Sequence, residues 1–223
     1  MAINLSKGQT INLSKDSKGN EYDLSQVTIG LGWKIRQKKK GFFSKLMGPS
    51  EADFDLDALA FLLDQNEKVA NLGTQRDMGG GRVVGLQGAD VIFFNNLRHP
   101  SGAVWHTGDD LTGGTGGDDE RIVVKLNELP PQYTKILFLV SIYQGRQKNQ
   151  HFGMVDNAFI RAVDARGKEI ARYNLSSDTS YDQKCSMDFG EVYRKDSDWK
   201  FRALGNAFDS DSFVDILRQY VYT

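Results

Sequence analysis

Apolar and polar residues alternate in short runs along most of the chain, and glycine or other turn residues separate the runs. A period of two over four to eight residues is typical of half-buried β-strands. The predicted strands are residues 3–7, 11–15, 26–33, 53–64, 68–72, 91–96, 103–106, 121–126, 135–143, 189–194 and 199–205, with a hairpin over 158–175. So many short strands, with no alternation of strand and helix, predict an all-β fold, a two-sheet β-sandwich.

Three of these runs also predict how the strands are arranged. INLSK at 3–7 returns as INLSK at 11–15 around Gly8-Gln9-Thr10, which predicts a β-hairpin. KILFLVSIY at 135–143 is nearly all apolar, so we expect a strand that is covered on both faces. The hairpin over 158–175 should turn near Arg166-Gly167.

Helical patterns are short and peripheral. Residues 211–221 keep apolar side chains at i, i+3, i+4 and i+7, which predicts a C-terminal helix capped from within 209–211. A second, very short helix is expected near 127–129, before Pro130-Pro131. Two breaks interrupt the strand pattern, at 36–52 and at 73–88, but no change of composition demands a second domain.

Bulk charge and cysteine usage exclude several classes of protein. The 28 Lys and Arg nearly balance 29 Asp and Glu, for a net charge of -1, so no global field would recruit nucleic acid. The single Cys185 excludes an intrachain disulfide framework and a CxxC motif. No run approaches the roughly 18 apolar residues of a membrane span, and MAINLSKGQT does not resemble a signal peptide. We therefore expect a cytoplasmic protein.

The most unusual segment is HTGDDLTGGTGGDDE at 106–120, which holds five carboxylates and five glycines within Gly108–Glu120. Glycines let the backbone turn back, so the acidic ends on either side of LTGGTGG can converge. Two carboxylates about 4–5 Å apart repel by about 3–4 kcal/mol at an effective dielectric near 20, and a divalent cation reverses that effect. Calcium, which takes six to eight oxygen ligands in adaptable geometry, suits these residues better than magnesium, zinc or copper.

A second acidic group precedes and begins the strand DFDLDALAFLLD. Alternation places Asp53, Asp55 and Asp57 on one face of it. This is not an EF-hand loop, because Ala58 stands where the turn glycine should be and no Glu lies at the twelfth position. Asn95 and Asn96, at the end of VIFFNN, offer neutral oxygens.

These motifs together resemble the TerD family of tellurium-resistance and general stress proteins. The matching blocks are DFDLDA at 53–58, VIFFNNL at 91–97, HTGDDLTGGTGGDDE at 106–120, AFIRAVD at 158–164, ARYNL at 171–175, FGEVYR at 189–194 and WKFRALG at 199–205. The resemblance implies a β-sandwich that binds calcium through its loops and serves bacterial stress responses, including tolerance of tellurite. It also implies one TerD-like domain over 1–223, with loop insertions near 36–52 and 73–88.

The resemblance also implies a set of calcium ligands. By position these are Asp55, Asp57, Asp109, Asp110, Asp118, Asp119 and Glu120, with Thr112, Asn95, Asn96 and Asp53 as further candidates. The first seven carry seven negative charges, more than one Ca²⁺ compensates, so we expect two ions. The segment between the acidic ends lacks the extra acid that family loops often carry.

The leading hypothesis is a calcium-binding, non-enzymatic stress protein. Two alternatives stay open: a metal-dependent hydrolase that uses the same acids with His106 as its base, and a purely structural assembly module that calcium stiffens. The family implies partners among other Ter proteins and a membrane-bound protein, and leaves the oligomeric state open. KKKGFFSKLMG at 38–48 is either a loop folded onto the sandwich or a basic, apolar lip for the inner face of a membrane.

Overall fold

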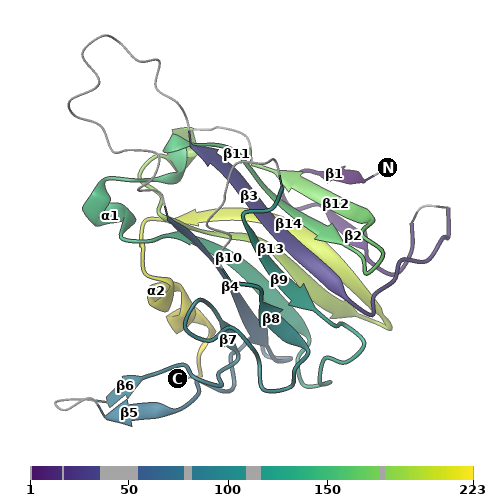
Figure 1. Cartoon of the computed structure of the whole chain (residues 1–223), viewed down its shortest axis with the longest axis horizontal. Coiled ribbons are helices and arrows are strands. Elements are labelled where there is room, and N and C mark those ends of the chain that lie inside the picture. Colours follow the sequence, from purple (N-terminus) through teal and green to yellow (C-terminus); the bar gives the residue numbers. More distant parts are fainter. Residues whose placement is uncertain are drawn as a thin grey trace, which may run out of the picture.

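The computed structural model describes residues 2–16, 18–35, 55–77, 82–108, 117–175 and 179–222. Two six-stranded sheets pack face to face, and a separate two-stranded hairpin projects from one end (Figure 1). This confirms the predicted all-β, two-sheet sandwich. Within the described part of the chain, no helix is long and apolar enough to cross a membrane.

Each sheet is built from strands that lie far apart in the sequence. The first sheet has the order β1 (Ile3–Leu5), β12 (Glu169–Asn174), β11 (Val155–Val163), β3 (Val27–Ile35), β9 (Glu120–Val124) and β8 (Val104–His106). The second has the order β2 (Thr10–Asn12), β14 (Asp198–Phe208), β13 (Ser186–Lys195), β10 (Lys135–Ile142), β4 (Leu56–Leu63) and β7 (Val91–Ile92). The hairpin predicted over 158–175 is confirmed as the antiparallel pair β11–β12.

The predicted N-terminal hairpin is wrong. β1 pairs in parallel with β12, with Ile3 opposite Ala171, whereas β2 pairs with β14, with Ile11 opposite Phe201. A turn between them closes through Gln9 N–H donating to the Ser6 carbonyl at 3.0 Å. An isolated two-stranded pair is at best marginally stable, so each half of the INLSK repeat gains more by extending a large sheet.

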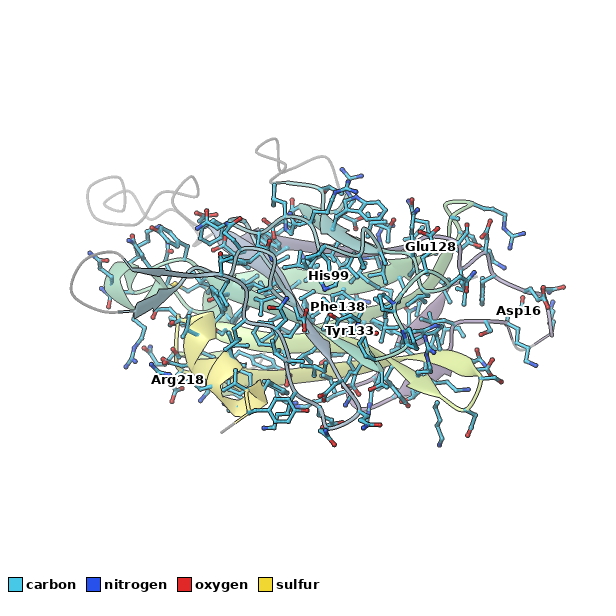
Figure 2. The ribbon with its side chains drawn as sticks, turned by 90° about the horizontal axis from the view of Figure 1, so that it is seen from below. Asp16, His99, Glu128, Tyr133, Phe138 and Arg218 are labelled. Atoms are coloured by element: carbon cyan, nitrogen blue, oxygen red, sulfur yellow. The ribbon has the colours of Figure 1, made fainter. Side chains whose placement is uncertain are left out.

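The main core lies between the two sheets, where alternate residues of every long strand meet. Phe138 and Phe201 are fully buried there. Figure 2 shows Phe138 in the interior, whereas Asp16 and Arg218 lie at the periphery.

β10 is buried on both faces, as its continuous apolar run predicts. Its inner residues join the main core, and Leu137 and Leu139 join a second cluster on the outer face. The helix α2 (Phe213–Leu217) and the 3-10 turn η5 (Arg218–Tyr220) cover that outer face, with Ile216 and Leu217 buried in the cluster. The C-terminal helix is therefore confirmed, although its α-helical part is shorter than predicted.

Several local predictions need correction. The strand predicted over 91–96 stops at Ile92, because Asn96 N–H donates to the Phe93 carbonyl at 2.9 Å and closes a turn. Residues 127–129 form a turn rather than a helix. The return strand over 68–72 is reduced to one bridge between Val69 and Val221.

The two predicted breaks differ in what the structure describes. Residues 73–88 hold the hairpin β5 (Gln75–Asp77) and β6 (Arg82–Val84), where we expected no regular structure. Residues 36–52, including the proposed lip at 38–48, lie outside the described residues. Further short elements that the sequence did not predict are α1 (Gly145–Lys148), η3 (Phe152–Met154) and η4 (Thr179–Tyr181).

Candidate metal site

The acidic segment ends beside a contact between the two sheets, formed near the first residues of β9 and β4. β9 begins at Glu120, directly after the glycine-rich stretch, and β4 of the opposite sheet begins at Leu56. The backbone N–H of Ala58 in β4 donates to Oε2 of Glu120 in β9. One buried carboxylate therefore ties the first sheet to the second at this end of the sandwich.

His106 lies beside that carboxylate. Its Nε2 is 3.4 Å from Oε2 of Glu120, and both residues are buried. Nδ1 of His106 accepts a hydrogen bond from Gly108 N–H at 3.0 Å, so in the neutral ring the proton sits on Nε2 and faces Glu120. Both ring nitrogens of His106 are engaged.

Asp119 is held by the backbone of β3. Oδ2 of Asp119 accepts from Trp33 N–H at 2.8 Å, and Asp119 N–H donates to the Leu31 carbonyl at 2.8 Å. Because these bonds lie just beyond the β3–β9 ladder, they fix the chain as it leaves the glycine-rich stretch.

Asp118 has a different partner. Arg161 grips it with two parallel hydrogen bonds, Nε to Oδ1 at 2.6 Å and Nη2 to Oδ2 at 3.0 Å. The Asp118 carboxylate lies against Gly30, where an added Cβ would come within 2.2 Å of its Cγ. A glycine at position 30 is therefore what lets this acid lie flat on the sheet.

The Arg161 pair is part of a longer charge network. Nη1 of Arg161 also donates to Glu169 at 2.9 Å, and Glu169 accepts from Arg172. The hydrogen bonds to Asp118 raise the pKa of the Arg161 guanidinium against the effect of its burial. Burial opposes ionisation of Glu169, but the bonds from Arg172 and Arg161 outweigh it and lower the Glu169 pKa.

The predicted acidic ligands point in different directions. Glu120 lies opposite Leu31, a core residue, so its side chain faces the space between the sheets. Arg161 lies opposite Gly30, one residue along, so it grips Asp118 on the outer face of the first sheet. In this arrangement, Asp118 and Glu120 cannot ligate the same ion.

The second acidic group also diverges from Glu120. Leu56 and Ala58 belong to the inter-sheet core, so Asp57 between them faces the outer side of the second sheet, opposite Ser141. Asp55 lies just before β4, exposed, and its carbonyl accepts from Tyr143 N–H at 2.8 Å. The alternation predicted for this strand is present, but it turns Asp57 away from Glu120.

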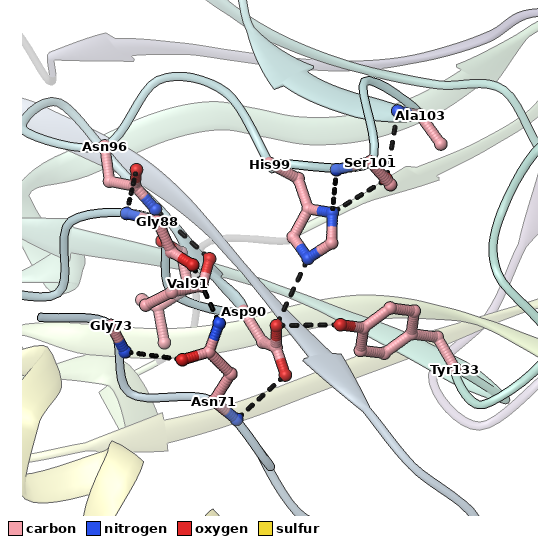
Figure 3. A network of polar contacts seen from close by, with 11 residues as sticks. Asn71, Gly73, Gly88, Asp90, Val91, Asn96, His99, Ser101, Ala103 and Tyr133 are labelled. Atoms are coloured by element: carbon pink, nitrogen blue, oxygen red, sulfur yellow. Dashed lines mark hydrogen bonds and ion pairs between the residues drawn. The ribbon is translucent and has the colours of Figure 1, made fainter.

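Of the two predicted asparagines, Asn96 holds a turn with its side-chain amide. Nδ2 of Asn96 donates to the carbonyls of Ala89 and Val91 at 3.2 and 2.7 Å, and its Oδ1 accepts from Gly88 N–H at 3.2 Å (Figure 3). The carbonyl of exposed Asn95 accepts from Gln87 Nε2.

Other predicted ligands cannot be located. Asp53, Asp109, Asp110 and Thr112 lie outside the described residues. Among the residues that are described, no three His, Cys, Asp or Glu side chains are grouped so as to hold a metal ion. The described acids do fit calcium in donor type. Calcium prefers oxygen ligands, and each of these residues offers carboxylate oxygens.

A second buried acid escaped the sequence analysis altogether. Oδ1 of Asp90, which is fully buried, accepts from Tyr133 OH at 2.8 Å and lies 3.2 Å from His99 Nε2 (Figure 3). Its Oδ2 accepts from Asn71 N–H at 3.0 Å, and His99 Nδ1 lies 2.7 Å from Ser101 Oγ. Burial first, and then Asp90, raise the pKa of Tyr133. These residues come from separate loops and form no motif, so only the fold brings them together.

Comparison with known proteins identifies the family. The TerD domain model matches residues 1–74 and 80–220. The chain belongs to the TerD family. Tellurium resistance protein TerX from Serratia marcescens is 51% identical over 221 residues, 99% of this chain and 100% of that protein. Stress response protein SCP2 from Bacillus subtilis (strain 168) is 38% identical over 222 residues, 99% of this chain and all of that protein.

A solved structure supports the fold. The crystal structure of a homologue of telluride resistance protein (TerD) from Streptomyces coelicolor A3(2) has a TM-score of 0.54 at 20% identity, covering 85% of this chain and 94% of that one. The chain is thus a TerD domain in a family of proteins named for tellurium resistance and stress response, and none of the relatives named here is described as an enzyme.

Proposed function

We propose that this TerD domain is a calcium-binding, non-enzymatic stress-response protein whose ions bind in the glycine-rich acidic segment. The proposal rests on the hydrogen bonds that fix the C-terminal end of that segment. Backbone N–H groups of two different sheets, from Trp33 and Ala58, fix the carboxylates of Asp119 and Glu120. Fixed carboxylates next to further acids favour a divalent cation, because its charge offsets their mutual repulsion.

The proposed ligands are those of the segment itself, Asp109, Asp110, Thr112, Asp119 and Glu120, with Asp118 recruited from Arg161 and Asp55 and Asp57 in outer positions. Two ions remain the expected number, since acids on opposite faces of the first sheet cannot share one. Calcium supplies positive charge here and no reaction step. Because it would bind only the folded chain, calcium would raise the stability of the whole sandwich.

A metal-dependent hydrolase is the weaker alternative. It would need a base with a nitrogen open to a bound water. Both ring nitrogens of His106 face partners within the protein, Gly108 N–H and Glu120. That arrangement favours a positioning role for His106.

The remaining parts of the proposal concern partners and place. We propose a cytoplasmic protein that meets other Ter-family proteins and a membrane-bound partner, with calcium shifting the strength of that contact. A purely structural assembly module is the alternative that would share this behaviour. A monomer of constant size with and without calcium, in the presence of the partner, would count against both.

Calorimetric titration with calcium and with magnesium tests the central claim. We expect calcium to bind with a stoichiometry near two and to raise the melting temperature, and magnesium to do so much less. Asp119→Asn should weaken binding while leaving the fold intact. Absence of calcium binding in protein first stripped with a chelator would refute the proposal.

A further inference from the structure

Asp118 is enclosed on both of its sides. Its side chain is only 6% exposed, with the Arg161 guanidinium along its two oxygens and the Gly30 backbone against its carboxyl carbon. A parallel two-bond pair of this kind is among the stronger and more directional polar contacts in proteins. The guanidinium occupies the edge of the carboxylate where both oxygens can be bound together, so a cation that binds both oxygens there must take the place of Arg161.

Arg161 has a second anchor that would keep it in position. Its Nη1 bonds Glu169, which lies on the neighbouring strand β12. Glu169 is shared with Arg172, whose guanidinium carbon lies 4.0 Å from the centre of the Phe159 ring. The Phe159 ring in turn fills the space beside Gly32, where a Cβ would come within 2.5 Å of it. The network therefore runs across the outer face of β3, β11 and β12.

We propose that Arg161 is a built-in counter-ion that competes with calcium for Asp118. The inference rests on the proposed calcium binding and adds a residue that sets its affinity. Calcium and the guanidinium are alternative partners of one carboxylate. When calcium takes Asp118, Arg161 is left with Glu169 alone, and the charge pattern on the outer face of the first sheet changes. Binding at the loop thereby alters a surface that a partner can detect.

The test compares three variants by calcium calorimetry. Arg161→Gln removes the competing charge and should bind calcium about tenfold more tightly, the order of magnitude expected when one charge-assisted pair no longer has to be broken. Arg161→Lys keeps the charge but loses the two-bond grip, and should fall between wild type and Arg161→Gln. Arg172→Gln is the matched control, because Arg172 bonds Glu169 and makes no hydrogen bond to Asp118. Its affinity should stay within twofold of wild type.

A second measurement reports on the pair directly. In wild type with a chelator, the Arg161 Nε–H signal in NMR should be shifted relative to Asp118→Asn, and calcium should move it towards the position seen in that variant. Calcium binding with equal or weaker affinity in Arg161→Gln, or with an unmoved Arg161 signal, would overturn the competition and leave calcium binding intact. If wild type and Arg161→Gln both fail to bind calcium, the competition and the proposed function fall together.

Discussion

Two histidine–carboxylate pairs lie towards opposite ends of the same strand. Glu120 meets His106 and the N–H of Ala58, near the start of β4. Asp90 meets His99, and its carbonyl accepts from the N–H of Leu62, four residues further along β4 and roughly 13 Å away at about 3.3 Å per residue. Both acids are buried.

The difference between the pairs lies in their surroundings. Asp90 is a single acid whose oxygens accept from Tyr133, from Asn71 N–H and from His99. Glu120 is the last of three consecutive acids at the exit of a glycine-rich stretch. Burial and a histidine neighbour are therefore common to a structural cross-link and a candidate ion site. The density of negative charge next to a glycine-rich segment is what separates them.

Removing the Asp90 side chain should have the largest effect on stability. Asp90→Ala leaves Tyr133 OH and His99 Nε2 buried with a lost acceptor, so we expect a loss of about 3 kcal/mol in the free energy of unfolding. Urea denaturation measures it. Tyr133→Phe, which deletes one donor, should cost only about 1 kcal/mol. Calcium should still stabilise both variants, and loss of that effect would show that the two pairs are coupled.

Glu120→Gln should have the opposite effect: it should change the calcium response more than the stability in a chelator. Ala58 N–H and His106 Nε2 both approach the same oxygen, Oε2, so the single amide oxygen of Gln can serve both. Stability in a chelator should therefore fall less than in Asp90→Ala. The calcium-dependent gain, about 2.7 kcal/mol at a hundredfold excess over Kd, should be lost. Thermal melts with and without calcium measure both quantities. A full calcium response in this variant would remove Glu120 from the site.

Gly30→Ala asks whether the packing of Asp118 matters. The new methyl would overlap the Asp118 carboxylate, so we expect a loss of about 2 kcal/mol and separation of Asp118 from Arg161. Gly117→Ala is the matched control, since nothing lies within 4 Å of its added Cβ. It should be nearly neutral in urea denaturation. Equal losses from both variants would point to a general effect of glycine replacement.

A third buried acid, Asp188, should make the stability of the fold depend on pH. Burial raises the pKa of Asp188 from 3.8 to about 6, although hydrogen bonds from Asn206 partly offset this. Asp188 thus favours the fold most when protonated, below about pH 4, and that contribution is lost as the pH rises through 6. Asp188→Asn should flatten the fall in stability between pH 4 and 6 by about 1–2 kcal/mol. An unchanged slope in urea titrations would show that Asp188 does not titrate there.

The sequence predicted the sandwich because its strands repeat with period two and its turns carry glycine. It also predicted that β10 is buried on both faces, since a run without polar positions has no face suited to solvent. Which strands pair with each other was harder to predict from these patterns. The INLSK repeat is compatible with a hairpin, and only the edges offered by β12 and β14 decide otherwise.

The candidate site shows the same limit. Oxygen donors and glycines in one segment are visible in the sequence, but the direction of each side chain is set by register. The partner of Asp118 comes from β11, more than forty residues away, so a count of seven uncompensated charges overlooks Arg161. The role of Asn96 was hidden for a similar reason, because its amide serves backbone groups close in the sequence but brought together only by the turn.

The N-terminal segment has a consequence for aggregation. Residues 3–12 contribute one of the two edge strands of each sheet, β1 in the first sheet and β2 in the second. A single proteolytic cut beyond Asn12 would uncover the borders of β12 and β14 together, and each would present unpaired N–H and C=O groups to other chains. The first dozen residues therefore protect one edge of each sheet, and their loss should favour self-association before it unfolds the core.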